Sequence, residues 1–291
     1  MELPASITAL GEQLRRPGEI APAQTLFCDA EVFAAERARI FARPLTAVDH
    51  ETRLEADGHY FRCDTSPRPV ILTRANGGRL RALRNVCIHA GYPVCEAEQG
   101  AAERLICPYH GWEFALDGRL LEPDLSARID PARLRLTEYP VYVLSGLILV
   151  DLSGNAEDQQ RPPPLPAWLA AAKVVRRARY CTTWNWKLVH HFLKSSPRLF
   201  SDVAPQSSVA IGPLSWVIAW PQRAVLLRVV PKFAAQTDFH VVEMVAQGAP
   251  EEAPAAGSDA VARKLRCTEP SVHCFDRRFA DWYWSMMAPA Q

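Results

Sequence analysis

Two short segments of the chain each place one cysteine close to one histidine. One residue separates Cys87 from His89, two residues separate Cys107 from His110, and seventeen residues lie between the two segments. Thiolates and imidazoles are ligands of zinc and of iron–sulfur clusters. The spacing of these four residues therefore predicts a metal centre held by two loops.

The arrangement of the ligands within the loops favours iron and sulfur over zinc. Zinc sites in small domains usually keep like ligands together, as C-x2–4-C and H-x3–5-H, whereas each loop here mixes the two types. In a [2Fe–2S] cluster of the Rieske type, thiolates hold one iron and imidazoles hold the other. Gly91 and Gly111 follow the histidines and allow tight backbone turns. A structural zinc and four unconnected core residues are the alternatives. The predicted cluster ligands are Cys87, His89, Cys107 and His110.

The loops lie within a stretch of short β-rich runs, separated by turn residues such as Gly77 and Gly118. This pattern predicts a compact antiparallel β domain. The last run contains the longest apolar segment, which we expect to form one buried strand. The predicted strands cover residues 59–62, 70–73, 80–83, 104–106, 112–116 and 139–150.

A proline-rich segment at residues 161–166 predicts a linker, because consecutive prolines favour an extended conformation and cannot donate to a sheet. Before the β domain, Asp29 is a predicted helix N-cap, and the first twenty residues are expected to be a loosely ordered arm. After the linker we expect a strand near 178–183, a helix over 186–194, three strands and a last helix over 270–287. The predicted domains are an N-terminal arm and helix (1–43), a β domain (44–160) and a second domain (161–291).

Composition and charge exclude several classes of protein. The chain has 33 lysines and arginines against 32 acidic residues, a net charge of +1, which gives no global footprint for nucleic acid. The longest apolar run is too short to cross a bilayer. No secretory signal is recognisable at the N-terminus, so a cytoplasmic location is expected, where cysteines are core thiols or metal ligands.

At these residues the chain resembles the Rieske non-haem iron oxygenases, the family of aromatic ring-hydroxylating dioxygenase α subunits. Segments 83–89 and 107–112 look like its two cluster loops, and segment 184–188 looks like the opening of its catalytic domain. The resemblance covers most of the chain after residue 27, with one departure at Ala90, where the family often has arginine. It implies an α+β fold: an N-terminal antiparallel β Rieske domain followed by a helix-grip (START/SRPBCC-like) domain, in which an antiparallel sheet wraps over a C-terminal helix.

The catalytic domain of the family holds a mononuclear Fe(II) through two histidines and one carboxylate. Matched onto this chain, the two histidine positions fall on Pro197 and Asp202, and proline has no side-chain donor atom. An unusual site made of His190, His191, Asp202 and Asp276 is the alternative. Neighbouring helical residues point about 100° apart, so both histidines reach one iron only with an irregular backbone. The favoured interpretation is a degenerate domain without the mononuclear iron.

The resemblance implies a Rieske [2Fe–2S] oxidoreductase that supports O2-dependent hydroxylation or demethylation of an organic substrate. Electrons are expected from a separate reductase or ferredoxin, because the chain has no glycine-rich loop for a flavin or nicotinamide phosphate. The alternative is a non-catalytic electron-transfer or structural subunit that partners an intact oxygenase α subunit. A homo- or hetero-oligomer with oxygenase subunits is expected in both cases. A complete set of three iron ligands would distinguish the two roles, and Pro197 favours the second.

Overall fold

The computed structural model describes residues 2–42, 45–64, 68–121, 134–153, 164–195, 200–250, 261, 263, 265 and 276–288. The chain divides into two compact units. The first, called here the β unit, is Leu45–Arg161. The second, called the helix–sheet unit, combines Met1–Pro44 with Pro162–Gln291. The N-terminal segment, predicted to stand by itself, therefore folds with the C-terminal part of the chain.

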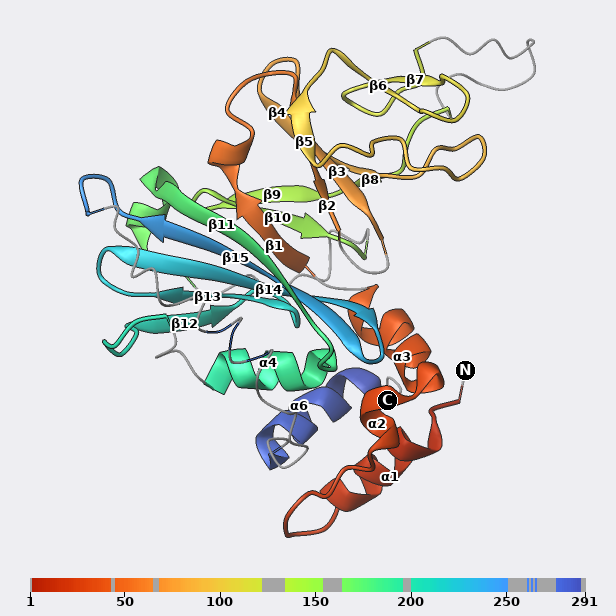
Figure 1. Ribbon diagram of the computed structural model, residues 1–291, viewed down its shortest axis with the longest axis vertical. Coiled ribbons are helices and arrows are strands. Elements are labelled where there is room, and N and C mark those ends of the chain that lie inside the picture. The colour runs from red at the N-terminus through yellow and green to blue at the C-terminus, as the bar shows by residue number, and fades with distance from the viewer. Residues whose placement is uncertain are drawn as a thin grey trace. The chain divides into compact units, whose positions relative to one another are not determined.

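The described part of the β unit forms antiparallel sheets with the orders β1-β10-β9, β5-β2-β3-β4-β8 and β6-β7 (Figure 1). Each predicted run contains at least one strand, so the expected antiparallel β domain is confirmed; β1 and β5 were not predicted. A short 3-10 helix covers Glu51–Arg53. The strands are β1 Leu45–His50, β2 His59–Cys63, β3 Val70–Ala75, β4 Arg79–Arg84, β5 Gln99–Ala101, β6 Arg104–Ile106, β7 Glu113–Ala115, β8 Glu138–Tyr139, β9 Val141–Leu144 and β10 Leu147–Asp151.

The apolar run at residues 139–150 is not one strand, and that prediction was wrong. β9 and β10 form a hairpin in which Leu147 pairs with Leu144. The turn residues Ser145 and Gly146 have φ values of 48° and 77°, the left-handed conformation that a tight reversal requires. β10 is buried along its whole length, which explains the apolar composition. The apolar composition correctly indicated the burial of β10, but β9 is partly exposed and the reversal of the chain was not predicted.

The helix–sheet unit contains one five-stranded antiparallel sheet with the order β11-β15-β14-β13-β12. Helices α4 and α6 lie along one face of it (Figure 1), and their apolar residues share one core with that face. The fold is α+β, as predicted, with a sheet packed over helices. A short 3-10 helix, Ala167–Ala171, precedes β11, and a π-helical turn, Arg37–Phe41, follows α3. The other elements are α1 Ala5–Leu14, α2 Thr25–Cys28, α3 Ala30–Glu36, β11 Lys173–Thr182, α4 Trp186–Ser195, β12 Ser207–Ala210, β13 Ser215–Ala219, β14 Arg223–Phe233, β15 Gln236–Val245 and α6 Arg277–Met287.

The N-terminal residues form a packed helix, α1, rather than the loosely ordered arm that we predicted. Ile7 and Leu10 are buried in the core that also contains α6. Gly11 lies so close to the Trp284 ring that a Cβ atom at this position would be 2.4 Å from it. Arg277 donates to three carbonyl oxygens at and just beyond the C-terminal end of α1, at 2.6–3.2 Å. Contacts with α6, which lies far from α1 in the sequence, therefore stabilise α1.

The predicted start of the next long helix is confirmed. Asp29 is the N-cap of α3, and its Oδ1 accepts hydrogen bonds from the backbone N–H groups of Glu31 and Val32 at 2.6 and 3.2 Å. This cap satisfies two of the amides that have no partner inside the helix.

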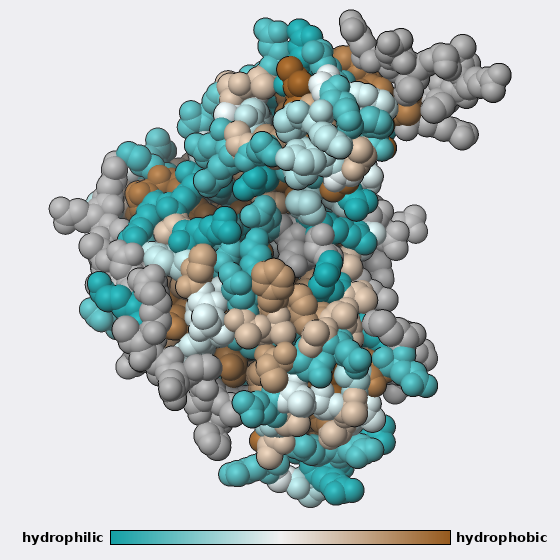
Figure 2. Space-filling model, turned by 45° about the vertical axis from the view of Figure 1, so that its right-hand side comes forward, coloured by the Kyte–Doolittle hydropathy of each residue, from teal (hydrophilic) through white to brown (hydrophobic). Residues whose placement is uncertain are grey.

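Figure 2 shows one face of the molecule, on which hydrophilic residues alternate with areas of more hydrophobic ones. No helix in the described ranges has both the length and the apolar character needed to cross a membrane.

Candidate metal centre

The two loops that carry the predicted ligands have the same backbone conformation. The first follows β4, and the second connects β6 to β7. The carbonyl oxygen of Cys87 accepts from the N–H of Gly91 at 3.0 Å, and that of Cys107 accepts from Gly111 at 2.9 Å. These glycines have φ values of 73° and 71°. Any other residue would be strained there, so glycine is required for both turns.

The loops bring the four predicted ligand side chains together. The thiols of Cys87 and Cys107 are buried and lie within hydrogen-bonding reach of each other. The rings of His89 and His110 are exposed, with centroids 4.6 Å apart. The centre therefore has a buried sulfur side and a solvent-facing imidazole side.

Burial raises the pKa of the Cys87 thiol. The Cys107 thiol raises it further, whereas backbone hydrogen bonds at His89 and Ala90 act in the opposite direction. Because a metal binds thiolates, loading this centre must overcome the raised pKa of the Cys87 thiol and release its proton.

Aromatic rings hold the two imidazoles. Trp112 stacks on His89, with ring centroids 4.7 Å apart and an interplanar angle of 8°. Tyr109 packs on His110 at 3.9 Å and also contacts Tyr92 at 5.4 Å. Tyr109 nevertheless remains 57% exposed. The rings therefore orient the imidazoles without covering them.

A buried asparagine that we did not predict as a functional residue closes the first loop. Asn85 is 2% exposed, donates to the Cys95 carbonyl oxygen and accepts from the Cys95 N–H, both at 2.8 Å. An asparagine directly after β4 and two positions before Cys87 was the available signal.

The donor set fits a two-iron cluster. Among the described residues no group of three or more His, Cys, Asp or Glu side chains is placed to hold a single metal ion. A tetrahedral zinc needs all four ligands on one ion, whereas a Rieske cluster needs a pair of thiolates on one iron and a pair of imidazoles on the other. The buried thiol pair and the exposed imidazole pair match the second requirement.

Known proteins resemble this chain in sequence and in fold. Residues 45–140 match the family described as the Rieske [2Fe-2S] domain. The chain is 30% identical over 202 residues to the glycine betaine monooxygenase oxygenase subunit of Chromohalobacter salexigens, an alignment that covers 64% of this chain and 44% of the relative. It is 29% identical over 145 residues to the benzene 1,2-dioxygenase subunit alpha of Pseudomonas putida, which covers 48% of this chain and 32% of the relative.

The crystal structure of the apo form of a quaternary ammonium Rieske monooxygenase superposes on this chain with a TM-score of 0.66. That match covers 91% of this chain and 94% of the other at 18% identity, which shows a common fold. This chain is a homologue of the Rieske oxygenases. The β unit contains its Rieske domain, and the helix–sheet unit shares the fold of the solved Rieske monooxygenase. The chain spans less than half the length of the two curated relatives.

In the helix–sheet unit of this Rieske oxygenase homologue, His190 is buried among aromatic rings. It stacks on Trp282, with centroids 4.6 Å apart and an angle of 15°, and its ring lies 5.0 Å from that of Trp216. Burial lowers the pKa of His190 to about 3, and the charges of Lys194 and His191 act in the same direction. His190 is therefore a neutral core imidazole at ordinary pH.

Two of the other candidate iron ligands, His191 and Asp276, lie near Phe279, which His190 also contacts. His191 is half-buried against Phe279, and burial lowers its pKa although the Asp276 carboxylate opposes this. Asp276 is the N-cap of α6 and accepts from the Phe279 N–H at 2.8 Å, so α6 begins later than the predicted helix. Asp202 is exposed in the segment before β12, and Pro197 lies outside the described residues. Within the described ranges, His190, His191, Asp202 and Asp276 do not form a common site.

A buried ionic network that we did not predict joins three helices of this domain. Lys187 of α4 donates from Nζ to Oε1 of Glu36 in α3 at 2.6 Å. Tyr283 of α6 donates to the same oxygen at 2.7 Å, and Trp186 Nε1 donates to Oε2 at 2.7 Å. Burial lowers the pKa of Lys187, and the Glu36 carboxylate opposes this shift. The network holds the N-terminal segment against α4 and α6.

Proposed function

We propose that this chain is a Rieske-type oxidoreductase subunit of an oxygenase system, located in the cytoplasm, which accepts electrons from a separate reductase or ferredoxin. The observation that carries the proposal is the pair of matching loops with buried thiols and exposed imidazoles. The proposed cluster ligands are Cys87, His89, Cys107 and His110.

When bound, the [2Fe–2S] cluster supplies one-electron oxidation and reduction at a potential raised by its imidazole ligands. The protein excludes water from the thiols and orients the imidazoles through Trp112 and Tyr109. Exposed apolar side chains next to the histidines, Ile88 and Tyr92 among them, give a redox partner a surface to contact.

The downstream reaction that we propose is O2-dependent hydroxylation or demethylation of an organic substrate by an assembly that contains this chain. The relatives named for glycine betaine and benzene oxidation support an organic substrate. Of the two roles considered above, we favour the electron-transfer subunit, because Pro197, which has no side-chain donor atom, stands where the family has a histidine ligand. The mononuclear iron would then belong to a partner oxygenase subunit in a hetero-oligomer.

Metal analysis of protein purified without oxygen tests this proposal. We expect about two iron atoms and two acid-labile sulfides per chain, both irons in the cluster. The chain supplied with a reductase and O2 should form no product from glycine betaine or benzene, and addition of an intact oxygenase subunit should restore turnover. A reproducible third iron, lost in His190→Ala or His191→Ala while the cluster spectrum survives, would instead make the chain a self-sufficient oxygenase component.

A further inference from the structure

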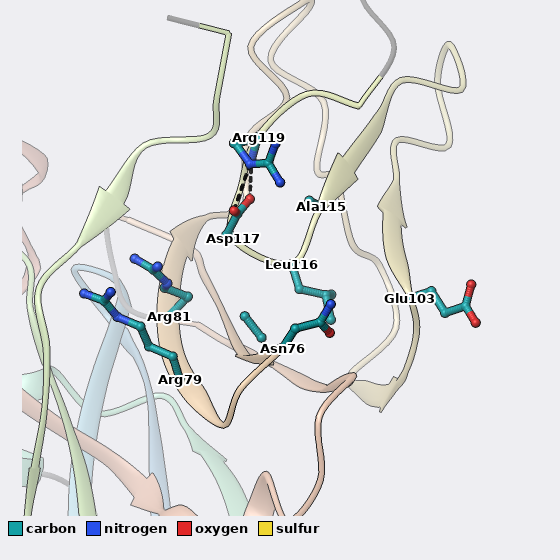
Figure 3. A pocket seen from close by; sticks show the side chains of 9 residues that line it. Asn76, Arg79, Arg81, Glu103, Ala115, Leu116, Asp117 and Arg119 are labelled. Atoms are coloured by element: carbon teal, nitrogen blue, oxygen red, sulfur yellow. Dashed lines mark hydrogen bonds and ion pairs between the residues drawn. The ribbon is translucent and has the colours of Figure 1, made fainter. Parts of the chain in front are cut away.

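The Rieske domain contains a pocket of about 230 Å³ that the proposed electron-transfer role does not use. Arg79 and Arg81 of β4 line it together with Arg119, which follows β7 (Figure 3). The apolar part of the lining includes Leu116 and Ala115. Three guanidinium groups beside an apolar wall are unusual for a surface hollow and are suited to an anion with an apolar body.

The pocket lies away from the cluster loops. β4 begins at Arg79, at the pocket, and ends at Arg84, just before the first cluster loop. The strand has six residues, and at about 3.3 Å per residue its ends are about 17 Å apart. The β6–β7 hairpin likewise has its cluster loop at one end and Ala115 of the pocket at the other. A ligand in this pocket would therefore not contact the cluster ligands.

The two arginines of β4 retain capacity to bind an anion. They are two residues apart in a strand, so their side chains project from the same face. Arg79 has no ion pair in the part of the chain that the structure describes. Arg81 Nη1 pairs with Glu138 at 2.6 Å and its Nε is buried, while 20% of its side chain is exposed. A ligand in the pocket would therefore contact the exposed Arg79 directly and Arg81 through the exposed part of its side chain.

The acidic residues of the pocket do not occupy these two arginines. Asp117 pairs with Arg119 at 2.9 Å. Burial raises the pKa of the Asp117 carboxyl, but the hydrogen bonds and charge of Arg119, with the charge of Arg135, outweigh this and keep the pKa below its ordinary value. The side chain of Glu103 extends away from the arginines (Figure 3). Arg119 is therefore neutralised within the protein, whereas no acidic residue of the pocket lining pairs with Arg79 or Arg81 in the described part of the chain.

We propose that this pocket binds a small organic carboxylate, with the carboxylate on Arg79 and Arg81 and the apolar body against Leu116. The planar guanidinium matches a carboxylate in a two-point contact. An inorganic anion would satisfy the charges but leave the apolar wall and most of the volume unfilled. A compact aromatic acid of the size of benzoate would pair with the arginines, contact the apolar wall and fill the volume of the pocket.

Titration of the full chain with benzoate, followed by calorimetry, tests the proposal. Acetate has the charge without the apolar body, and benzyl alcohol has the body without the charge. Benzoate is expected to bind about tenfold more tightly than either, because each lacks one of the two contributions. Added chloride should weaken benzoate binding, because the contact is between charges.

Matched variants locate the site. Arg79→Ala should weaken benzoate binding about tenfold, which corresponds to one charge-assisted hydrogen bond. Arg84→Ala removes the same charge from an exposed residue of the same strand and should leave the affinity within about twofold. Arg81→Lys keeps the charge, removes Nε and should also weaken binding.

Equal binding of benzoate, acetate and benzyl alcohol, no binding of benzoate, or full affinity in Arg79→Ala would each overturn the proposal. The visible absorption of the cluster, recorded on the same samples, reports the proposed redox function separately. Absence of benzoate binding in a protein with an intact cluster spectrum would therefore contradict the carboxylate site and leave the proposed redox function unaffected.

Discussion

Lys187 Nζ lies 2.6 Å from Glu36 Oε1, and neither side chain is exposed to solvent. Because Tyr283 and Trp186 also donate to the Glu36 carboxylate, one acid holds three donors from two helices. A buried pair of this kind stabilises a fold weakly compared with apolar packing, but the loss of one partner leaves an uncompensated charge. Helices α3, α4 and α6 are therefore expected to lose their arrangement when either charge is removed.

Replacement of Lys187 by methionine should lower the free energy of unfolding by about 3–5 kcal/mol, because Glu36 would remain buried without its counter-ion. Urea unfolding at pH 7 measures this change. The control is Lys194→Met in the same helix, where the lysine is exposed and a change below about 1 kcal/mol is expected. The double variant Glu36→Gln/Lys187→Met should be more stable than Lys187→Met alone. A cost below about 1 kcal/mol for Lys187→Met would show that the pair is not buried in solution.

The burial of His190 predicts a specific dependence of stability on pH. An unfolded histidine has a pKa of about 6.5, whereas the folded His190 has a pKa of about 3. Between these values the unfolded state binds the additional proton, so the free energy of unfolding falls as the pH falls through this window. The His190 contribution should be about 2 kcal/mol smaller at pH 5 than at pH 7.

Chemical denaturation at several pH values, with wild type and His190→Leu compared, checks this. In His190→Leu, the free energy of unfolding should change much less between pH 7 and pH 5 than in the wild type, whatever the stability of the variant at pH 7. Leu193→Met, a change in the same helix that removes no ionisable group, should keep the slope. An unchanged slope in His190→Leu would mean that the imidazole is solvated and protonates in the folded state.

The positive φ of Gly111 makes this residue a test of the second cluster loop. A Cβ atom there meets nothing within 4 Å, so the effect of Gly111→Ala comes from backbone strain alone. We expect a loss of stability of about 1–2 kcal/mol and a lower cluster content per chain. Gly77→Ala is the matched control, because Gly77 has a φ of 82° and equally open surroundings. It should cost similar stability while iron and sulfide per chain stay at the wild-type level, and equal cluster loss in both variants would contradict a local role of Gly111.

The elements that could be predicted from the sequence are those whose signals are local. The β runs, the Asp29 cap and the helix over 186–194 each depend on residues close in the chain, and the structure contains them. The hairpin within residues 139–150 was not predicted, because a run of apolar residues indicates that a segment is buried but not where the chain reverses direction. Helix α1 was missed because its packing partner, α6, lies at the other end of the chain.

The same distinction applies to the sites. The spacing of cysteine and histidine is a local signal, so the amino-acid sequence alone is enough to select the four proposed cluster ligands. The surroundings of His190 come from β13 and α6, and those of Lys187 come from α3 and α6, so neither could be inferred from neighbouring residues. The arginine pocket likewise combines β4 with the turn after β7.

Electron paramagnetic resonance of the reduced protein tests whether Cys87, His89, Cys107 and His110 bind one Rieske cluster. We expect a brown protein with the low-average-g signal of a Rieske centre, which Cys107→Ser abolishes. The signal should survive in Cys95→Ser, which removes another buried thiol beside the first loop. A colourless protein with one zinc per chain, or a Rieske signal that persists in Cys107→Ser, would show that these four residues do not hold a Rieske cluster.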